Sequence, residues 1–240
     1  MTETGKFQIG KVVAVSPTSQ YRRLMGAAEA VTNCIGMPDL SLTDDERLDL
    51  RFSVNQQSNP QNFIAVSSFV KTAEGNIIPK EIVLHPEHPE LPLTYIHELG
   101  HCFDYFCKKP YGYFSSCFEE EFAEWRIAVY ASEAYHLLGQ SVKAKRIVFE
   151  NVSTEQLLGF KKTPELHEAL VRAYEDHEIW ARAFCQYVVT DERNAEQEKW
   201  LGPMLDGRRD RYRNYACPLY WTAGDFKPIR DAMHAMFERR

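Results

Sequence analysis

The feature that most constrains this chain is the segment YIHELGHCFDY at residues 95–105. His97 and His101 lie four positions apart, so on a helix both imidazoles project from the same face. Two imidazoles held in this way can bind one Zn²⁺ ion, and the helix sets their separation in advance. The sequence therefore predicts a helix over 94–107, capped by Thr94, that presents a pair of metal ligands.

Three neighbours of the histidines fit a metal site. Glu98 lies about 100° further round the helix from His97, where a carboxylate can act as a general base. These residues form the HExxH pattern. Gly100 costs about 1 kcal/mol relative to alanine inside a helix, which predicts a close approach by another element. Asp104 shares the face of the histidines and can orient a ligand imidazole. Together they favour a metal site over ordinary surface or core histidines.

A zinc site of this kind needs a third protein ligand and leaves the fourth position open. Glu121 follows His101 by 121 − 101 = 20 residues, a spacing similar to that of thermolysin-like enzymes. It lies in an acidic run, which is typical of a solvated face or a helix N-terminus. Glu178 follows at 178 − 101 = 77 residues on a mostly apolar stripe, where a carboxylate needs a cation or a donor. A salt bridge to Arg182 would also meet that need. The local context favours Glu178, and Glu121 stays open.

The order of elements predicts an α+β fold, with a small, mostly antiparallel sheet beside a helical body and the HExxH helix at its centre. Pro79 places the last strand at an edge, or delays its start until after the proline. The expected strands are 50–54, 62–70 and 76–84. The expected helices besides 94–107 are 19–35, 118–138, 163–189 with an interruption near Asp176, and 226–240.

Length and composition fit one domain. The 240 residues are 44% hydrophobic, enough to bury a sizeable core. We expect a single domain over 1–240: a helical and β lead-in over 1–60, the sheet and HExxH helix over 61–107, and a helical part with the third ligand over 108–240. The net charge of −6 argues against a general nucleic-acid binder.

The sequence also predicts a cytoplasmic protein. The N-terminus lacks the basic start and apolar run of a signal peptide, and no stretch is apolar enough to span a membrane. Six cysteines are scattered without a CxxC pair, which indicates reduced and mostly buried thiols.

Two segments carry a resemblance to a known family. HELGHCFDY, followed by EIWARAFCQYV, resembles the metallopeptidase domains of phage and mobile-element polyvalent proteins. Their pattern reads HELGHxxD, then E-x-F/W-A-R-A-F-x-x-Y-V, then a closing amphipathic helix, which IRDAMHAMF (229–237) resembles. The catalytic domain of anthrax lethal factor looks similar. The resemblance covers residues 77–237 loosely and implies a zincin-like fold of the gluzincin type.

The resemblance also implies an activity. His97, His101 and Glu178 would hold Zn²⁺, and Glu98 would be the base in hydrolysis of a peptide bond by a metal-activated water. The substrate would be a protein or peptide, added as a strand along 81–85.

One part of the family pattern is missing. Lethal factor has a tyrosine seven residues before its third ligand, and Val171 stands there in this chain. Tyr174, one turn before Glu178, could serve as the oxyanion donor instead, although tyrosines on apolar faces are more often packed against their neighbours.

A second function stays open at this point. The chain could be a non-proteolytic, metal-stabilised binding module of a mobile element, associated with nucleic acid through GRRDRYRNY (207–215). Arginines interleaved with aromatic residues suit single strands. A solvated turn before the last helix explains the same segment more simply. Glu98 favours the enzyme, because a purely structural metal site needs no base.

Overall fold

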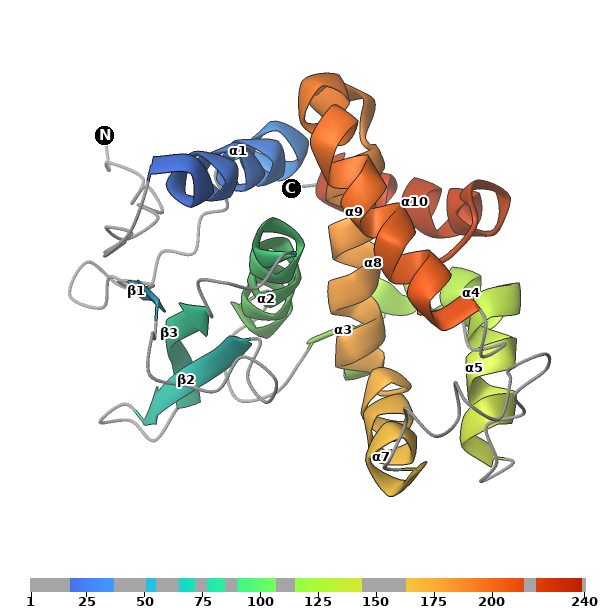
Figure 1. Cartoon of the computed structure of the whole chain (residues 1–240). Coiled ribbons are helices and arrows are strands. Elements are labelled where there is room, and N and C mark those ends of the chain that lie inside the picture. The colour runs from blue at the N-terminus through green and yellow to red at the C-terminus, as the bar shows by residue number, and fades with distance from the viewer. Residues whose placement is uncertain are drawn as a thin grey trace, which may run out of the picture.

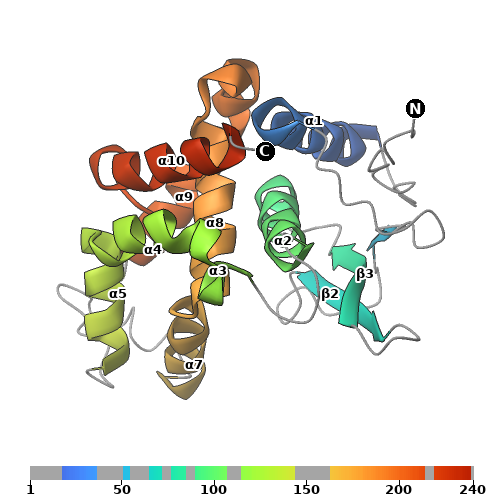
Figure 2. The same ribbon diagram turned by 180° about the vertical axis from the view of Figure 1, so that it is seen from behind.

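Helices form the body of the molecule, with a small sheet at one side of it (Figures 1 and 2). The computed structural model describes residues 18–36, 51–54, 65–71, 77–84, 90–106, 115–143, 163–213 and 219–238. Its α-helices are α1 Thr18–Ile35, α2 Leu91–Phe106, α3 Ser115–Phe118, α4 Ala123–Tyr130, α5 Glu133–Lys143, α7 Thr163–Ala173, α8 Asp176–Thr190, α9 Ala195–Arg213 and α10 Ala223–Glu238. Two 3₁₀ turns are η1 Glu120–Phe122 and η2 Glu192–Asn194, and the strands are β1 Arg51–Val54, β2 Ala65–Lys71 and β3 Ile77–Leu84.

The centre of the body is the contact between α2 and α8. A Cβ on Gly100 of α2 would lie 3.1 Å from the Cα of Ala181 and 3.2 Å from the Cβ of Phe184 on α8. The indole Nε1 of Trp180 donates a hydrogen bond of 3.0 Å to the Gly100 carbonyl. This confirms the close approach that Gly100 predicted, because only a residue without a side chain lets the two backbones meet here.

Helix α8 is buried on every side beyond its first turn. Every residue from Ile179 to Val189 is buried, as expected for a helix enclosed by other elements. Helices α1, α2, α7, α9 and α10 all contact it. Aromatic rings fill the space around it, with Phe237 of α10 packing edge-on against Phe103 of α2 at 5.2 Å between ring centroids. The closing helix therefore completes the core, as expected from its apolar stripe.

The sheet has three strands in the order β1-β3-β2. β3 pairs parallel with β1 and antiparallel with β2. The predicted edge position of the third strand is therefore wrong, because β3 lies in the middle. Pro79 is tolerated there because pairing with β1 begins only at Glu81, and the β2 register shifts between Ser68 and Phe69, next to the Phe69–Pro79 pair.

The predicted α+β class, with a mostly antiparallel sheet, is wrong for the body of the molecule, which is all α. Among the side chains that the structure describes, every buried core residue lies in a helix or in a turn beside one. The sheet also has as many parallel as antiparallel strand pairs. Val- and Ile-rich segments predict strands locally, but the fold class depends on which elements bury one another. Here helices pack on helices.

Other elements differ from the prediction in their bounds. The expected helix over 118–138 is broken at Ser132, and α5 begins after the break because Asp225 of α10 accepts hydrogen bonds from the main-chain N–H groups of Glu133 and Ala134. Helix α2 begins at Leu91, so Thr94 lies inside it and does not cap it. Residues 207–213 belong to α9 and not to a turn. The interruption expected near Asp176 is present, between α7 and α8.

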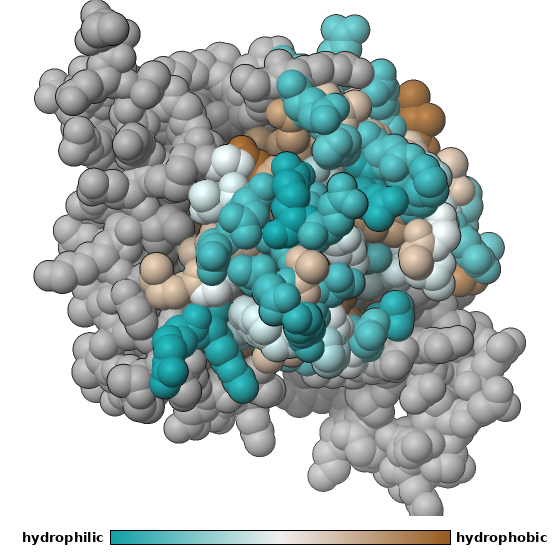
Figure 3. Space-filling model, turned by 90° about the horizontal axis from the view of Figure 1, so that it is seen from above, coloured by the Kyte–Doolittle hydropathy of each residue, from teal (hydrophilic) through white to brown (hydrophobic). Residues whose placement is uncertain are grey.

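The face seen in Figure 3 is mostly hydrophilic over its described part, with apolar residues scattered singly. Within the described ranges, no helix is both long enough and apolar enough to cross a membrane.

Candidate metal centre

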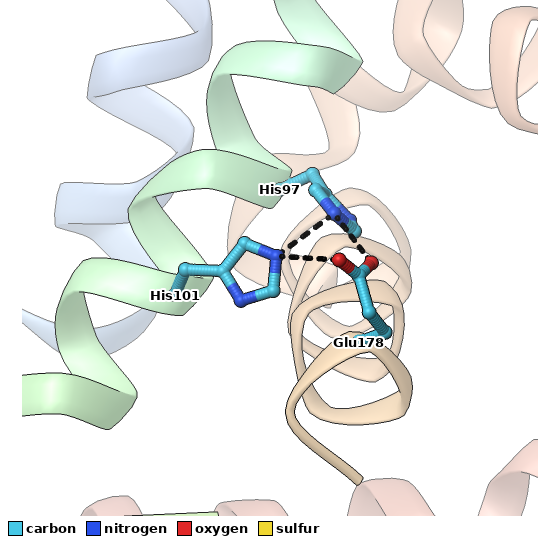
Figure 4. A group of neighbouring side chains, drawn as sticks. All are labelled: His97, His101 and Glu178. Atoms are coloured by element: carbon cyan, nitrogen blue, oxygen red, sulfur yellow. Dashed lines mark hydrogen bonds and ion pairs between the residues drawn. The ribbon is translucent and has the colours of Figure 1, made fainter. Parts of the chain in front are cut away.

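Three side chains from two helices converge beside the crossing of α2 and α8 (Figure 4). His97 and His101 project from successive turns of α2, with their Nε2 atoms 3.2 Å apart. Glu178, in the first turn of α8, faces both rings. Its Oε2 lies 3.3 Å from His97 Nε2, and its Oε1 lies 3.6 Å from His101 Nε2. Among the described residues, these three form the one group of histidine, cysteine or carboxylate side chains close enough to hold a metal ion.

The spacing of these atoms fits a tetrahedral cation. Zn²⁺ binds nitrogen and carboxylate oxygen at about 2.0–2.2 Å, which places neighbouring tetrahedral ligand atoms about 3.3 Å apart. The two Nε2 atoms are 3.2 Å apart, and they lie 3.3 and 3.6 Å from the two different oxygens of the Glu178 carboxylate. With one ligand atom taken from each residue, the three atoms lie within 4.8 Å of one another. The other ring nitrogen of His97, Nδ1, is buried and has no hydrogen-bond partner in the protein. Two imidazole nitrogens facing one carboxylate make a donor set suited to a divalent cation, and so the residues fit the metal that the HExxH pattern implies.

The electrostatics of the group show how it behaves without a metal. Burial lowers the pKa of His97. Burial also acts to lower the pKa of His101, but the contact with Glu178 outweighs it and the pKa is raised. For Glu178, burial acts to raise the pKa, whereas the two histidines hold it well below its usual range. A proton on His101 therefore faces an ionised Glu178, in the place where a cation would bind.

The structure distinguishes between the two candidates for the third ligand. Glu178 faces the histidines, whereas Glu121 lies exposed in η1 and is not part of the group. Glu98, the candidate base, is partly exposed on α2 next to His97. Its carboxylate is close enough to act on the pKa values of both His97 and His101, raising each.

Glu178 is held in place through its main chain. The guanidinium of Arg182 donates to the carbonyl of Glu178 at 3.2 Å, to that of Leu219 at 2.7 Å and to that of Ala173 at the end of α7. The sequence also allowed Arg182 as an ion-pair partner for the Glu178 carboxylate. Its contacts with three carbonyls instead tie the turn between α7 and α8 to the first turn of α8, which aims Glu178 at the histidines.

Asp104 has a different partner from the one expected. It is fully buried and accepts hydrogen bonds from the Ser116 main-chain N–H at 2.6 Å and from the Ser116 hydroxyl at 2.5 Å. The Ser116 carbonyl in turn accepts from Arg126 of α4 at 2.9 Å. Asp104 thus anchors α3 to the C-terminal half of α2, and its charge also acts to raise the pKa of His101.

Tyr174 does not lie where an oxyanion donor would be needed. Its ring stacks on Tyr135 of α5 with 4.8 Å between centroids. Its hydroxyl lies over Gly139, where an added Cβ would come within 2.8 Å of the oxygen. Of the two readings that the sequence left open for Tyr174, the structure shows the packed one, since this phenol packs against α5.

The predicted strand addition along 81–85 is also wrong for its described part. Glu81 to Leu84 of β3 pair with β1 on one side and with β2 on the other. A peptide cannot add as a strand where both edges are already bonded.

His177 was not singled out by the sequence analysis. Its ring centroid lies 5.6 Å from that of His101, and its Nε2 lies 3.4 Å from Glu175. Burial lowers its pKa, and the nearby His101 lowers it further. The only signal in the sequence was its place directly before the favoured third ligand.

The basic segment is engaged within the protein where it is described. Arg208 contacts the Glu90 carboxylate at 2.6 Å and the Thr94 hydroxyl at 2.6 Å. A guanidinium used in this way is not available to a nucleic-acid strand. Arg209 pairs with Asp206 at 2.8 Å. The other two arginines of the segment, Arg211 and Arg213, have side chains outside the described residues.

The cysteines of the described residues are mostly buried, as expected. Cys34, Cys102 and Cys185 are buried and Cys117 is half-buried. Burial raises the pKa of Cys34 and of Cys185 to about 12, which is typical of thiols that take no part in chemistry. Cys107 and Cys217 lie outside the described residues.

Comparison with known proteins does not assign the chain to a family. No family model matches it, and neither a curated protein nor a solved structure matches it. The candidate site therefore rests on its own geometry.

Proposed function

We propose that this protein is a zinc-dependent peptidase of the gluzincin type. The observation that carries the proposal is the convergence of His97, His101 and Glu178 at the ligand spacing of a tetrahedral cation, with Glu98 beside them. Three protein ligands leave one coordination position open, as in catalytic rather than structural zinc sites.

In the proposed reaction the metal supplies Lewis-acid polarisation of the substrate carbonyl and activation of a water molecule. Glu98 accepts a proton from the attacking water as the new C–O bond forms at the carbonyl carbon. It then delivers that proton to the amine nitrogen as the C–N bond breaks. Arg182 keeps Glu178 aimed at the histidines through the main chain, and the contact at Gly100 keeps α2 and α8 in register.

The substrate class in this proposal is a protein or peptide. A peptide would not add along Glu81–Leu84, so a different path to the site is needed. A cytoplasmic location and an origin in a phage or mobile element belong to the same proposal. The alternative, a metal-stabilised binding module, has less support. A purely structural metal site needs no base such as Glu98, and Arg208 is engaged with Glu90 and Thr94.

The test begins with metal content. The full chain without a histidine tag is loaded with zinc, dialysed and analysed, beside His97→Ala, Glu178→Ala and Glu121→Ala. We expect about one zinc per chain in the wild type and in Glu121→Ala, and strong loss in the other two variants. A wild type that binds no zinc after loading would refute the proposal.

The role of Glu98 as general base is tested with a variant that should still bind zinc. Glu98→Gln should hold zinc as the wild type does but lose cleavage of an unfolded protein substrate by about 100-fold or more. Equal cleavage by wild type and Glu98→Gln would remove Glu98 from the reaction. Zinc binding without any cleavage across a library of peptides would favour the binding module.

A further inference from the structure

Exposed apolar side chains gather on α3 and α4. Among the described residues, five large hydrophobic side chains are exposed, and three of them lie in the single segment 118–130. Phe118 is 74% exposed, Ile127 is 70% exposed and Tyr130 is 37% exposed. Single exposed apolar residues are ordinary, whereas a group of them marks a binding surface. These three residues are called the α3–α4 patch below.

Contacts between α3 and α4 hold the patch together. The guanidinium of Arg126 donates a hydrogen bond of 2.9 Å to the carbonyl of Ser116, which brings α4 back beside α3. The Cys117 thiol acts to raise the pKa of Tyr130, so these two side chains also lie close together. Ile127 lies three residues before Tyr130 and shares its side of α4. The remaining member of the patch directly follows Cys117, so all three belong to one surface.

Helix α3 connects the patch to both helices of the candidate metal centre. Asp104, one turn after His101 on α2, accepts two hydrogen bonds from Ser116. The main-chain N–H of His177, directly before the third ligand on α8, donates to the sulfur of Cys117. Figure 2 shows α3 in front of α8 and beside α2, and it contacts both helices. The exposed phenyl ring at the end of α3 therefore starts beside the proposed metal position.

Helix α4 reaches the same end of α8. The hydroxyl of Tyr130 donates a hydrogen bond of 2.9 Å to Asp176, the first residue of α8 and two positions before Glu178. The patch thus adjoins the start of α8 through α3 and through α4. A peptide needs a path to the metal other than the strand Glu81–Leu84, which is already paired on both sides. The patch supplies an apolar surface for that path.

Acidic side chains border the patch. Glu120 and Glu121 lie in the turn between α3 and α4, and both are exposed without a cationic partner among the described side chains. The one cation of the segment 115–130 is Arg126, which is engaged with the Ser116 carbonyl. Complementary charges steer partners together and suppress wrong ones. Lysine or arginine beside an apolar side chain would complement this surface, and an acidic peptide would be repelled.

We propose that the α3–α4 patch is the substrate-binding surface of the site, and that it takes extended peptide segments in which apolar side chains stand beside lysine or arginine. Phe118 and Ile127 contact the apolar side chains, and Glu120 and Glu121 attract the cations. This inference rests on the proposed function, since it places the patch beside a metal held by the three ligands. It names what a substrate must carry near the bond that is cleaved.

The test uses short synthetic peptides that can also bind the metal. Two hexapeptides carry leucine and phenylalanine between lysines. One has a hydroxamate, a zinc-binding group, at its C-terminus, and the other has it at its N-terminus, so both directions of binding are covered. Control peptides replace the apolar residues by serine, or the lysines by glutamate. Binding of each labelled peptide to the full chain is followed by fluorescence anisotropy, with and without bound zinc.

The apolar contact is tested with two variants of the patch. We expect Phe118→Ser and Ile127→Ser to bind zinc as the wild type does. Each should bind the better of the two probes about tenfold more weakly, the loss expected when about half of such a side chain is buried by the peptide. Met25→Ser, at an exposed apolar residue of α1, is the matched control and should bind like the wild type. The serine peptide should bind at least as weakly as the probe does to the variants.

The charge contribution is tested in the same assay. The double variant Glu120→Gln and Glu121→Gln should bind the probe about threefold more weakly at low salt, with little difference from the wild type at about 1 M salt, where surface charges are screened. Glu29→Gln, at an exposed glutamate of α1, is the control and should not change the affinity.

Each contrary result has a distinct meaning. Equal binding of the probes by the wild type, Phe118→Ser and Ile127→Ser overturns the patch as a substrate surface. If bound zinc adds nothing to the affinity for either hydroxamate probe, the patch is separate from the metal, and the inference is again overturned. Self-association of the wild type in sedimentation that is lost in Ile127→Ser would make the patch an interface between copies, which also overturns it. In these three cases a wild type that holds zinc leaves the proposed function standing, whereas a wild type that binds no zinc overturns both.

Discussion

Two glutamates at the ends of the α2–α8 contact illustrate two ways of accommodating a carboxylate. Glu90, just before α2, is buried against Arg208, with 2.6 Å between its Oε2 and the guanidinium Nε. The same guanidinium also reaches the Thr94 hydroxyl at 2.6 Å. Glu178, at the start of α8, faces the imidazoles of His97 and His101, at 3.3 and 3.6 Å.

The difference lies in what each group still lacks. Arg208 carries a permanent charge and several donors, so Glu90 has its counter-ion within the fold. The histidines near Glu178 are neutral unless they take up a proton, and their Nε2 atoms face one another and the carboxylate. The first arrangement is a closed ion pair. In the second arrangement the charge of Glu178 is balanced only when a proton or a metal cation binds between the carboxylate and the imidazoles. One end of the α2–α8 contact is therefore structural, and the other is a candidate functional site.

The largest expected effect comes from opening the closed pair. Arg208→Ala would leave the Glu90 carboxylate buried without its cation, which typically costs about 3–5 kcal/mol. Urea unfolding of the metal-free protein should show this loss. Arg209→Ala, which removes a partly exposed i,i+3 pair with Asp206, should change stability by less than about 1 kcal/mol. Similar losses in both variants would contradict the contrast between the two glutamates.

The second effect is stabilisation of the open site by metal. At a free zinc concentration one hundred times the dissociation constant, the folded wild type should gain about 2.7 kcal/mol. Glu178→Ala should gain far less under the same conditions, because a ligand is missing. Thermal unfolding with and without zinc measures the difference. If zinc does not change the unfolding temperature of the wild type, then the group around Glu178 binds no metal, and it is a complete structural contact like the Glu90–Arg208 pair.

The third effect tests the helix crossing that brings Glu178 to the histidines. Gly100→Val would force side-chain atoms against the Ala181 backbone, 3.1 Å from the position of its Cβ, and overpacking of this kind costs about 1–3 kcal/mol. Zinc affinity should fall with stability, since α8 must move away. Gly207→Val, in α9 with open space around it, is the control. Normal zinc affinity in Gly100→Val would mean that the crossing does not position the ligands.

The smallest effect is the response of the open site to pH. The pKa of His101 is raised by Glu178 against the effect of burial, so in the metal-free site His101 holds its proton to a higher pH than an ordinary histidine does. Zinc must displace that proton. Its affinity should therefore level off above the raised pKa and fall by about tenfold, or 1.4 kcal/mol, for each pH unit below it. Competition with a zinc-binding dye between pH 8 and pH 5.5 measures this, and a constant affinity over that range would contradict it.

Several features could be predicted because they depend on residues close together in the chain. The i,i+4 spacing of His97 and His101 sets their geometry as soon as the segment is helical, and Gly100 indicated a close neighbour. The acidic position of Glu178 on an apolar stripe distinguished it from Glu121, which lies exposed in the structure.

Other features depend on contacts between distant segments, and there the prediction was open or wrong. Tyr174 and Glu178 lie one turn apart in sequence, yet the chain bends between α7 and α8, so the phenol packs on α5 and the carboxylate faces α2. The place of β3 in the middle of the sheet and the all-α character of the body were also decided by long-range packing.

By itself, the sequence determined a helix carrying two histidines at the spacing of metal ligands, a glutamate beside them and a second carboxylate suited to join them. Only the tertiary structure decided which carboxylate meets the histidines, that His177 and not Tyr174 lies beside them, and that Arg208 is committed to Glu90. The physical reason is the distance along the chain between the residues that interact. Helical spacing is a property of a few consecutive residues, whereas the partner of a buried charge is chosen by how helices far apart in the chain pack together.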